Sequence, residues 1–240
     1  MPERPTPPNW RGRCAVAPSL LSFDLCNLER EVEMIAQAGI EILHIDVIDG
    51  HFSPSMPLGI ETIQQLRRRS TLAFDVHVMA TRHDYFVDAL LDTGIQQLSF
   101  HLETEPHPAR LLQRIRDAGV RAGLALKPST PVASLDYLIE QCDNVLLMLT
   151  NPGFSGHASE AQVPYAARKI ADLRRLVEAR HVGATIQIDG RVSPDTMRRF
   201  APTEVDIFVA GSACISRASP AASLKELVAL GRVLGGEPRP

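Results

Sequence analysis

The stretch HIDVIDGHF, residues 44–52, places two groups that could do chemistry inside an apolar segment. His44 and Asp46 stand two residues apart among isoleucine, leucine and valine. Alternate residues of a strand share one face, so the imidazole and the carboxylate should point the same way. Burying such a pair is costly unless a partner satisfies it. The pattern therefore indicates either a bound metal ion or a reaction.

Two further apolar runs carry the same kinds of side chain. In AFDVHVM, Asp75 and His77 share one strand face, and Asp189 ends the run ATIQID. Imidazole and carboxylate ligands suit a divalent transition metal, and Zn2+, Fe2+, Mn2+ and Co2+ are all compatible with such a set. Each residue taken alone could equally be a satisfied interior polar group.

The elements that must position these residues follow a regular alternation. Eight short apolar runs are each followed by a segment with helical periodicity, which predicts parallel strands covered by helices. Gly39, Gly94 and Gly119 stand where helices should end and strands begin. We predict one α/β domain over residues 14–234, a single (β/α)8 TIM barrel. A doubly wound open sheet is the alternative, although no GxGxxG follows the first run.

Length and composition agree with one barrel and exclude some functions. A chain of 240 residues fits a single barrel, and a net charge of -3 does not predict a nucleic-acid partner. No apolar run reaches the roughly 20 residues needed to cross a membrane. Residues 1–13 and 235–240 are predicted as flexible tails without a signal peptide. The four cysteines lack CxxC spacing, which predicts reduced, mostly buried thiols in a cytoplasmic protein.

Barrel enzymes gather their reactive side chains at the C-terminal ends of the strands. Reading those ends predicts that His44, Asp46, His77 and Asp189 converge on one mouth, where such a set suits a divalent transition metal. Two glycine-containing loops, NPGFSG and AGSA, follow later strands. Loops after the seventh and eighth strands often bind phosphate. The alternative is that these glycines only make tight turns.

Several motifs in order resemble the ribulose-phosphate 3-epimerase family, and they span nearly the whole predicted barrel. The matching pieces are APSLLS at 17–22, HIDVIDGHFSP at 44–54, DVHVM at 75–79, NPGFSG at 151–156, IDG at 188–190 and AGSA at 210–213.

The resemblance implies a metal-dependent epimerase that holds one divalent metal ion per chain and acts on a phosphorylated ketose. Its metal ligands match His44, Asp46, His77 and Asp189, and its acid/base pair matches Asp46 and Asp189. The implied reaction inverts C3 through an enediolate, with D-ribulose 5-phosphate and D-xylulose 5-phosphate as the pair. The resemblance also implies a homo-oligomeric enzyme of the pentose phosphate pathway. The implied substrate contacts are Ser19, His77, Gly153, Phe154, Ser155, Gly156, Gly190, Gly211 and Ser212.

The loops that should recognise the substrate depart from the family pattern. Arg191 replaces the last glycine of DGG, Ser155 replaces a glycine in GFGG, and Ile48 replaces a common methionine. Arg191 could bind the phosphate directly or fill the pocket and exclude the usual substrate. An epimerase of allulose 6-phosphate or of a tetrulose phosphate therefore stays open as an alternative. A non-catalytic sugar-phosphate-binding barrel and a metal-free phosphate-binding barrel are alternatives of other classes.

The remaining polar residues receive plainer interpretations. His101 and Glu103 are expected to be interior or supporting polar groups, and Asp49–Gly50 a turn. Trp10 lies in the predicted tail and carries no signal. Four histidines in loops or on helices are expected to be solvated: His83, His107, His157 and His181.

Overall fold

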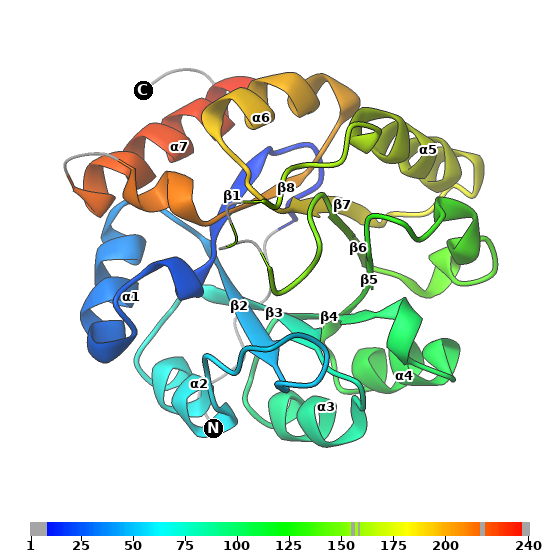
Figure 1. Ribbon diagram of the computed structural model, residues 1–240, viewed down its shortest axis with the longest axis horizontal. Helices are drawn as coiled ribbons and strands as arrows, with labels where there is room; N and C mark the ends of the chain where they lie inside the picture. The colour runs from blue at the N-terminus through cyan, green and yellow to red at the C-terminus, as the bar shows by residue number, and fades with distance from the viewer. Residues whose placement is uncertain (1–8, 155–156, 158, 217–218, 237–240) are drawn as a thin grey trace.

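The computed structural model describes residues 9–154, 157, 159–216 and 219–236 of the chain. Strands form an inner ring and helices form an outer wall around it (Figure 1). All strand pairs are parallel, in the order β1-β8-β7-β6-β5-β4-β3-β2. A parallel bridge between Ser19 and His44 joins the first and last members of this order. The predicted (β/α)8 barrel is confirmed, and the open sheet is excluded.

The eight predicted apolar runs all form strands. The strands are β1 (Ala15–Pro18), β2 (Ile42–Ile48), β3 (Ala73–Met79), β4 (Gln97–His101), β5 (Arg121–Leu126), β6 (Asn144–Met148), β7 (Thr185–Asp189) and β8 (Ile207–Ala210).

The outer wall is built from amphipathic helices whose apolar faces cover the ring. They are α1 (Leu28–Gln37), α2 (Ile60–Arg67), α3 (Asp84–Leu91), α4 (Pro108–Asp117), α5 (Ala166–Ala179), α6 (Pro194–Phe200) and α7 (Pro220–Leu234). Short 3-10 helices lie in the connections at Leu20–Ser22, Leu25–Asn27, Leu102–Thr104, Val132–Leu135, Ile139–Gln141, Ala201–Thr203 and Ser212–Ile215.

Local sequence sets several helix boundaries. Ser193 and Ser219 each precede a proline, and each serine side chain accepts a backbone N–H from the first turn of α6 or α7. Such caps satisfy donors that a helix start leaves free. At the other end of three helices, Gly39, Gly94 and Gly119 adopt φ of 87°, 85° and 72°, the left-handed conformation that glycine tolerates best.

The prediction of a helix after every strand is wrong at the fifth unit. Between β5 and β6, all of which is described, the chain makes two 3-10 turns and no α-helix. Val132, Leu135 and Ile139 point into the core from these turns. A spacing of three and then four residues suits a 3-10 turn as well as an α-helix, so periodicity could not separate them.

The base of the barrel is closed by a residue from the predicted N-terminal tail. Trp10 is fully buried with a small apolar cluster that includes Ile42 and Ile207, and the Arg121 guanidinium lies 5.7 Å from its ring centre. The backbone N–H of Gly12 donates to Asp206 (2.6 Å). Residues 9–13 therefore form part of the barrel, because burying a large indole outweighs the cost of ordering a short segment.

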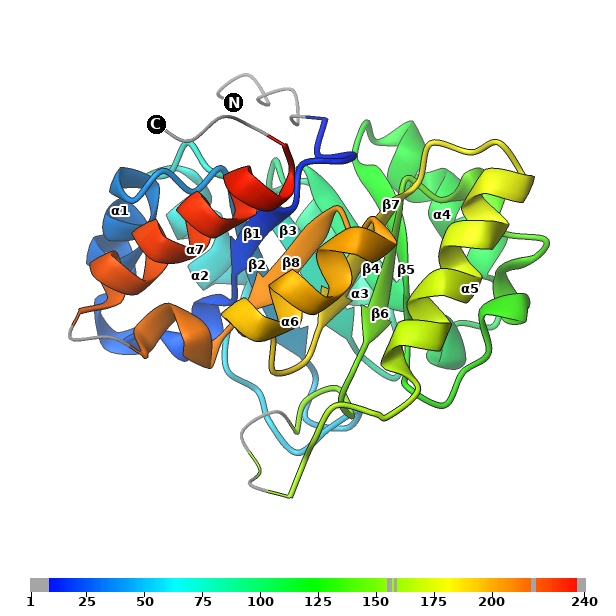
Figure 2. The same cartoon turned by 90° about the horizontal axis from the view of Figure 1, so that it is seen from above.

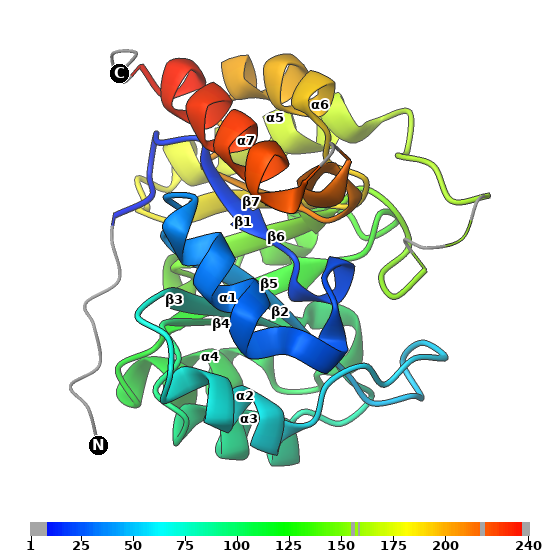
Figure 3. The ribbon, with the colours of Figure 1, turned by 90° about the vertical axis from the view of Figure 1, so that its left-hand side faces the viewer.

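The two ends of the barrel differ in character. The described ends of the chain lie at one end, while the long loops after β2 and β6 extend from the opposite end (Figures 2 and 3). Those loops surround the C-terminal ends of the strands, where the candidate site lies.

Candidate active site

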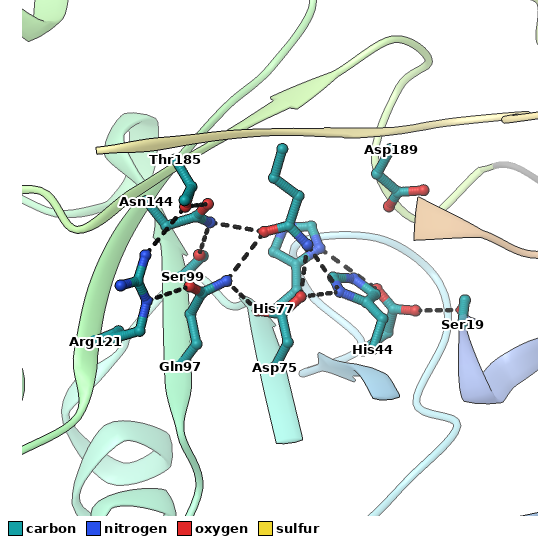
Figure 4. A network of polar contacts seen from close by, with 12 residues as sticks. Ser19, His44, Asp75, His77, Gln97, Ser99, Arg121, Asn144, Thr185 and Asp189 are labelled. Atoms are coloured by element: carbon teal, nitrogen blue, oxygen red, sulfur yellow. Dashed lines mark hydrogen bonds and ion pairs between the residues drawn. The ribbon is translucent and has the colours of Figure 1, made fainter. Parts of the chain in front are cut away.

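The register between β2 and β3 sets the arrangement of the site. His44 pairs with Asp75, and Asp46 pairs with His77. Both strands turn these side chains toward the barrel interior, where Figure 4 shows His44, Asp75 and His77, while the intervening residues face the helices in the apolar core. Imidazoles and carboxylates therefore alternate across the two strands as well as along each one.

The four predicted ligands meet at the mouth of the barrel. One ligand atom from each of His44, Asp46, His77 and Asp189 lies within 4.8 Å of the others. His44 Nε2 and His77 Nδ1 are each 3.4 Å from Asp46 Oδ1. The hydroxyl of Ser19 donates to Asp46 Oδ2 (2.8 Å) and so holds the carboxylate in place.

These residues fit a divalent metal ion. His44 Nε2 and His77 Nδ1 are buried and have no hydrogen-bond partner in the part of the chain that the structure describes. A buried nitrogen without a partner is costly, and a cation between these atoms would satisfy both of them. Two imidazoles with two carboxylates form a ligand set compatible with Zn2+, Fe2+, Mn2+ or Co2+.

The site favours a positive charge. Burial alone would lower the pKa of His44, but the carboxylates of Asp46 and Asp75 outweigh it and raise that pKa well above its usual range. Burial likewise opposes ionisation of Asp46, yet the neighbouring His44 and His77 lower its pKa. Asp189 has a raised pKa because it is buried and faces the Asp46 charge. The pKa values of the two carboxylates are therefore shifted in opposite directions.

The other ring nitrogen of His44 is held by a carboxylate that the sequence analysis left without a role. His44 Nδ1 lies 2.7 Å from Asp75 Oδ2. Gln187 and Gln97 also donate to Asp75, at 2.5 Å and 2.8 Å (Figure 4). This fixes the proton of His44 on Nδ1 and leaves Nε2 free to bind a metal.

A layer of polar side chains lies beneath Asp75 inside the barrel. Gln187 Oε1 accepts from Gln97 (3.2 Å) and Asn144 (2.7 Å), while Arg121 donates to Gln97 Oε1 (3.1 Å). Thr185 in turn donates to Asn144 (2.8 Å). Barrel interiors are usually filled by branched apolar residues. Here a connected polar network holds the floor of the site rigid.

The turn after β7 brings backbone close to the site. Gly190 donates to Asp189 Oδ1 (2.6 Å). Its φ is 111°, and a Cβ there would lie 2.8 Å from the Thr150 backbone nitrogen, so only glycine fits. Arg191 also adopts a left-handed φ, 51°, which is a strained conformation for a side-chain-bearing residue. Its guanidinium donates to the His157 carbonyl (2.6 Å).

A cavity of about 490 Å³ opens above the four ligands. Predicted residues that line it are Ser19, Asp46, Gly153, Asp189, Gly190, Arg191, Gly211 and Ser212. Ile48, one of the departures from the family pattern, lines it as well. The other lining residues, which were not among the predicted substrate contacts, are Leu21, Ser22, Pro54, Ser55, Met79, Met148, Thr150, Asn151 and His157.

Not every predicted contact reaches this cavity. His77 is fully buried beneath it, and Phe154 lies edge-on against the His157 ring at 5.6 Å. Ser155 and Gly156 lie outside the described residues. The cavity is therefore formed by the turns after β1, β2, β6, β7 and β8, whose residues come together only when the barrel closes.

The outlying histidines divide into two groups. His107, His157 and His181 are exposed, as expected. The expectation for His83 is wrong, because this side chain is buried and its Nε2 lies 2.9 Å from the Thr104 hydroxyl. The His83 ring also packs on Phe100 of β4. This contact could not be predicted from the loop sequence alone.

Comparison with known proteins identifies the chain's relatives. Residues 15–215 match the model of the ribulose-phosphate 3 epimerase family. Ribulose-phosphate 3-epimerase of Mycobacterium leprae (strain TN) is 34% identical over 212 residues, which cover 88% of this chain and 92% of that protein. The enzyme of the same name from Treponema pallidum (strain Nichols) is 36% identical over 201 residues, covering 84% and 91%.

Solved structures add evidence on the fold. KGPDC from Streptococcus mutans in complex with D-R5P aligns with a TM-score of 0.70 at 12% identity, over 91% of this chain and 97% of that one. At this identity the likeness supports the barrel fold alone. The family match and the curated relatives carry the assignment further. The chain is an isomerase-class enzyme that belongs to the ribulose-phosphate 3-epimerase family.

Proposed function

We propose that this protein is a metal-dependent epimerase that interconverts D-ribulose 5-phosphate and D-xylulose 5-phosphate by inverting C3. The observation that carries the proposal is the pair of buried nitrogens, His44 Nε2 and His77 Nδ1, which have no hydrogen-bond partner among the described residues and lie 3.4 Å from Asp46 Oδ1. Together with Asp189 they offer one divalent ion a complete set of protein ligands.

A bound ion would act as a Lewis acid. It would stabilise the negative charge that develops when the carbon next to the ketone loses its proton. Asp46 and Asp189 come from β2 and β7, on different sides of the ring (Figure 1). One of these carboxylates takes the proton from C3 and leaves an enediolate, and the other then gives a proton to C3 from the opposite face. The two carboxylates exchange these roles in the reverse reaction, so each epimer can be converted into the other.

The phosphate group of the substrate would be held by the turns after β7 and β8. We assign this role to the backbone of Gly190, Gly211 and Ser212 and to the guanidinium of Arg191. These groups line the cavity together with Gly153 from the loop after β6. Arg191 is able to form two parallel hydrogen bonds with a phosphate, a contact that the glycine of the usual DGG motif cannot make.

Arg191 also favours a second candidate, an epimerase of allulose 6-phosphate or of a tetrulose phosphate. The arginine occupies cavity volume and is held by the His157 carbonyl, so it changes the room left for the sugar. Steady-state kinetics with each ketose phosphate on the metal-reconstituted enzyme separates the candidates. We expect kcat/KM to be highest for D-ribulose 5-phosphate; a preference of tenfold or more for another ketose, on the order of 1.4 kcal/mol, overturns that assignment.

Arg191→Gly restores the usual motif and provides a matched test of the arginine. If the guanidinium binds phosphate, this change raises KM by about 10-fold, as expected for one lost charged hydrogen bond of 1.4 kcal/mol or more, and leaves kcat nearly unchanged. If the arginine instead excludes the substrate, Arg191→Gly lowers KM.

We further propose that the enzyme works in the cytoplasm, in the pentose phosphate pathway, as a homo-oligomer. All four cysteines are free thiols, and only Cys26 is exposed, which suits a reducing compartment. None of the described helices combines the length and apolar character that a membrane crossing requires. Light scattering on the purified protein tests the assembly, and a mass of about 26.3 kDa, that of one chain, would contradict it.

A further inference from the structure

His77 is not isolated on the side that faces away from the four ligands. His101, the last residue of β4, is fully buried beside it. The two Nε2 atoms are 3.0 Å apart, and the ring centres are 5.0 Å apart. On its other side, His101 Nδ1 lies 3.0 Å from Glu103 Oε2. The three side chains therefore form a continuous line that leads away from the site.

The direction of each hydrogen bond in this line follows from one requirement. If His77 binds a metal through Nδ1, its proton is on Nε2, and that N–H must donate to His101 Nε2. His101 then carries its own proton on Nδ1 and donates it to Glu103. Every polar hydrogen is used once, with no donor facing another donor.

Glu103 is held firmly at the end of the line. Its Oε1 accepts the backbone N–H of Lys127 (2.7 Å) and the hydroxyl of Thr130. Phe52 packs against the His101 ring at 4.6 Å, and the Lys127 ammonium lies 4.4 Å from the Phe52 ring centre. These contacts leave the His101 ring little freedom to rotate.

We propose that His101, oriented by Glu103, is a positioning residue that keeps His77 in the tautomer able to bind a divalent metal ion. This inference rests on the proposed metal site. It assigns a role to His101 and Glu103, which are not among the four candidate ligands. His44 is oriented directly by a carboxylate, that of Asp75, whereas His77 is oriented by a second imidazole, that of His101. Partners of this kind typically change metal affinity by 10- to 100-fold when they are removed.

The test compares two substitutions in the metal-free protein. His101→Phe keeps a planar ring but cannot accept a hydrogen bond, and we expect it to weaken Co2+ binding about 10- to 100-fold. His101→Gln offers an amide oxygen as acceptor, and we expect affinity within about threefold of the natural protein. Co2+ titration followed by visible absorption gives both the affinity and the ligand field, independently of any substrate.

His83→Phe is the matched control, since His83 is also buried but is not one of the four ligands, and its Nε2 lies 2.9 Å from the Thr104 hydroxyl. It should leave Co2+ affinity unchanged. Wild-type affinity in His101→Phe overturns the inference, as does a loss in His101→Gln equal to that in His101→Phe, which indicates packing alone. If the natural protein itself binds no Co2+, the proposed metal site fails first.

A measurement on the natural protein covers the case in which His101→Phe does not fold. Nitrogen-15 NMR of the zinc-loaded, histidine-labelled protein reports which ring nitrogen carries each proton. We expect the proton of His77 on Nε2 and that of His101 on Nδ1. A His101 ring with its proton on Nε2 overturns the inference without any substitution.

Discussion

Replacing Asp75 by asparagine isolates the role of the charge that orients His44. Asp75 is fully buried and accepts from His44 (2.7 Å), Gln97 (2.8 Å) and Gln187 (2.5 Å). Asparagine has nearly the same shape, but one of its two terminal atoms is a donor. Because both carboxylate oxygens of Asp75 accept hydrogen bonds, at least one donor in Asp75→Asn must face another donor.

The magnitudes follow from this count. One unsatisfied buried donor costs about 1–3 kcal/mol of folding free energy. If the new amide faces His44 Nδ1, the histidine proton moves to Nε2, the atom that should bind the metal. We therefore expect Asp75→Asn to lose about 1–3 kcal/mol of stability and to bind Mn2+ or Co2+ about 10- to 100-fold more weakly.

Urea unfolding and calorimetric metal titration measure the two effects separately. Asp206→Asn is the matched control, because its two oxygens accept backbone N–H groups from Gly12 (2.6 Å) and Ile186 (2.7 Å) near the base of the barrel. It should lose similar stability and keep its metal affinity. Wild-type metal affinity in Asp75→Asn would show that Asp75 does not set the tautomer of His44, and the reasoning would be refuted.

Three further changes test other parts of the account. Asp46→Asn and Asp189→Asn should each lower kcat by about 100- to 10,000-fold in a coupled assay; activity within tenfold of the natural enzyme rules out their acid/base role. Gly190→Ala should destabilise the protein by about 1–3 kcal/mol in thermal unfolding, because its φ is 111° and a Cβ would meet the Thr150 backbone. Trp10→Ala should cost about 3–5 kcal/mol with metal affinity unchanged, and an unaltered melting temperature would contradict the burial of this residue.

The four candidate ligands could be predicted from sequence because most of their signal is local. His44 with Asp46 and Asp75 with His77 alternate within single strands, and strand periodicity is enough to place each pair on one face. The barrel could be predicted because the strand pattern occurs eight times, and the eight strands form the observed parallel ring.

The supporting residues could not be found in the same way, since their partners are set by register. Asp75 was noted beside His77 along the chain, but it binds His44 because β2 and β3 pair in that register. Gln187 reaches Asp75 from a strand 112 positions away. Trp10 was hidden by its proline- and arginine-rich neighbours, and only the closed base of the barrel gives it a place to be buried.

The most direct test of the central claim follows hydrogen exchange at C3. The metal-reconstituted protein is incubated with D-ribulose 5-phosphate in D2O, and C3 is observed by NMR. The account predicts deuterium at C3 together with the appearance of D-xylulose 5-phosphate, and neither after the metal is removed. Metal bound at one ion per chain without exchange would contradict the substrate assignment, and exchange that persists without metal would contradict the role of the four ligands.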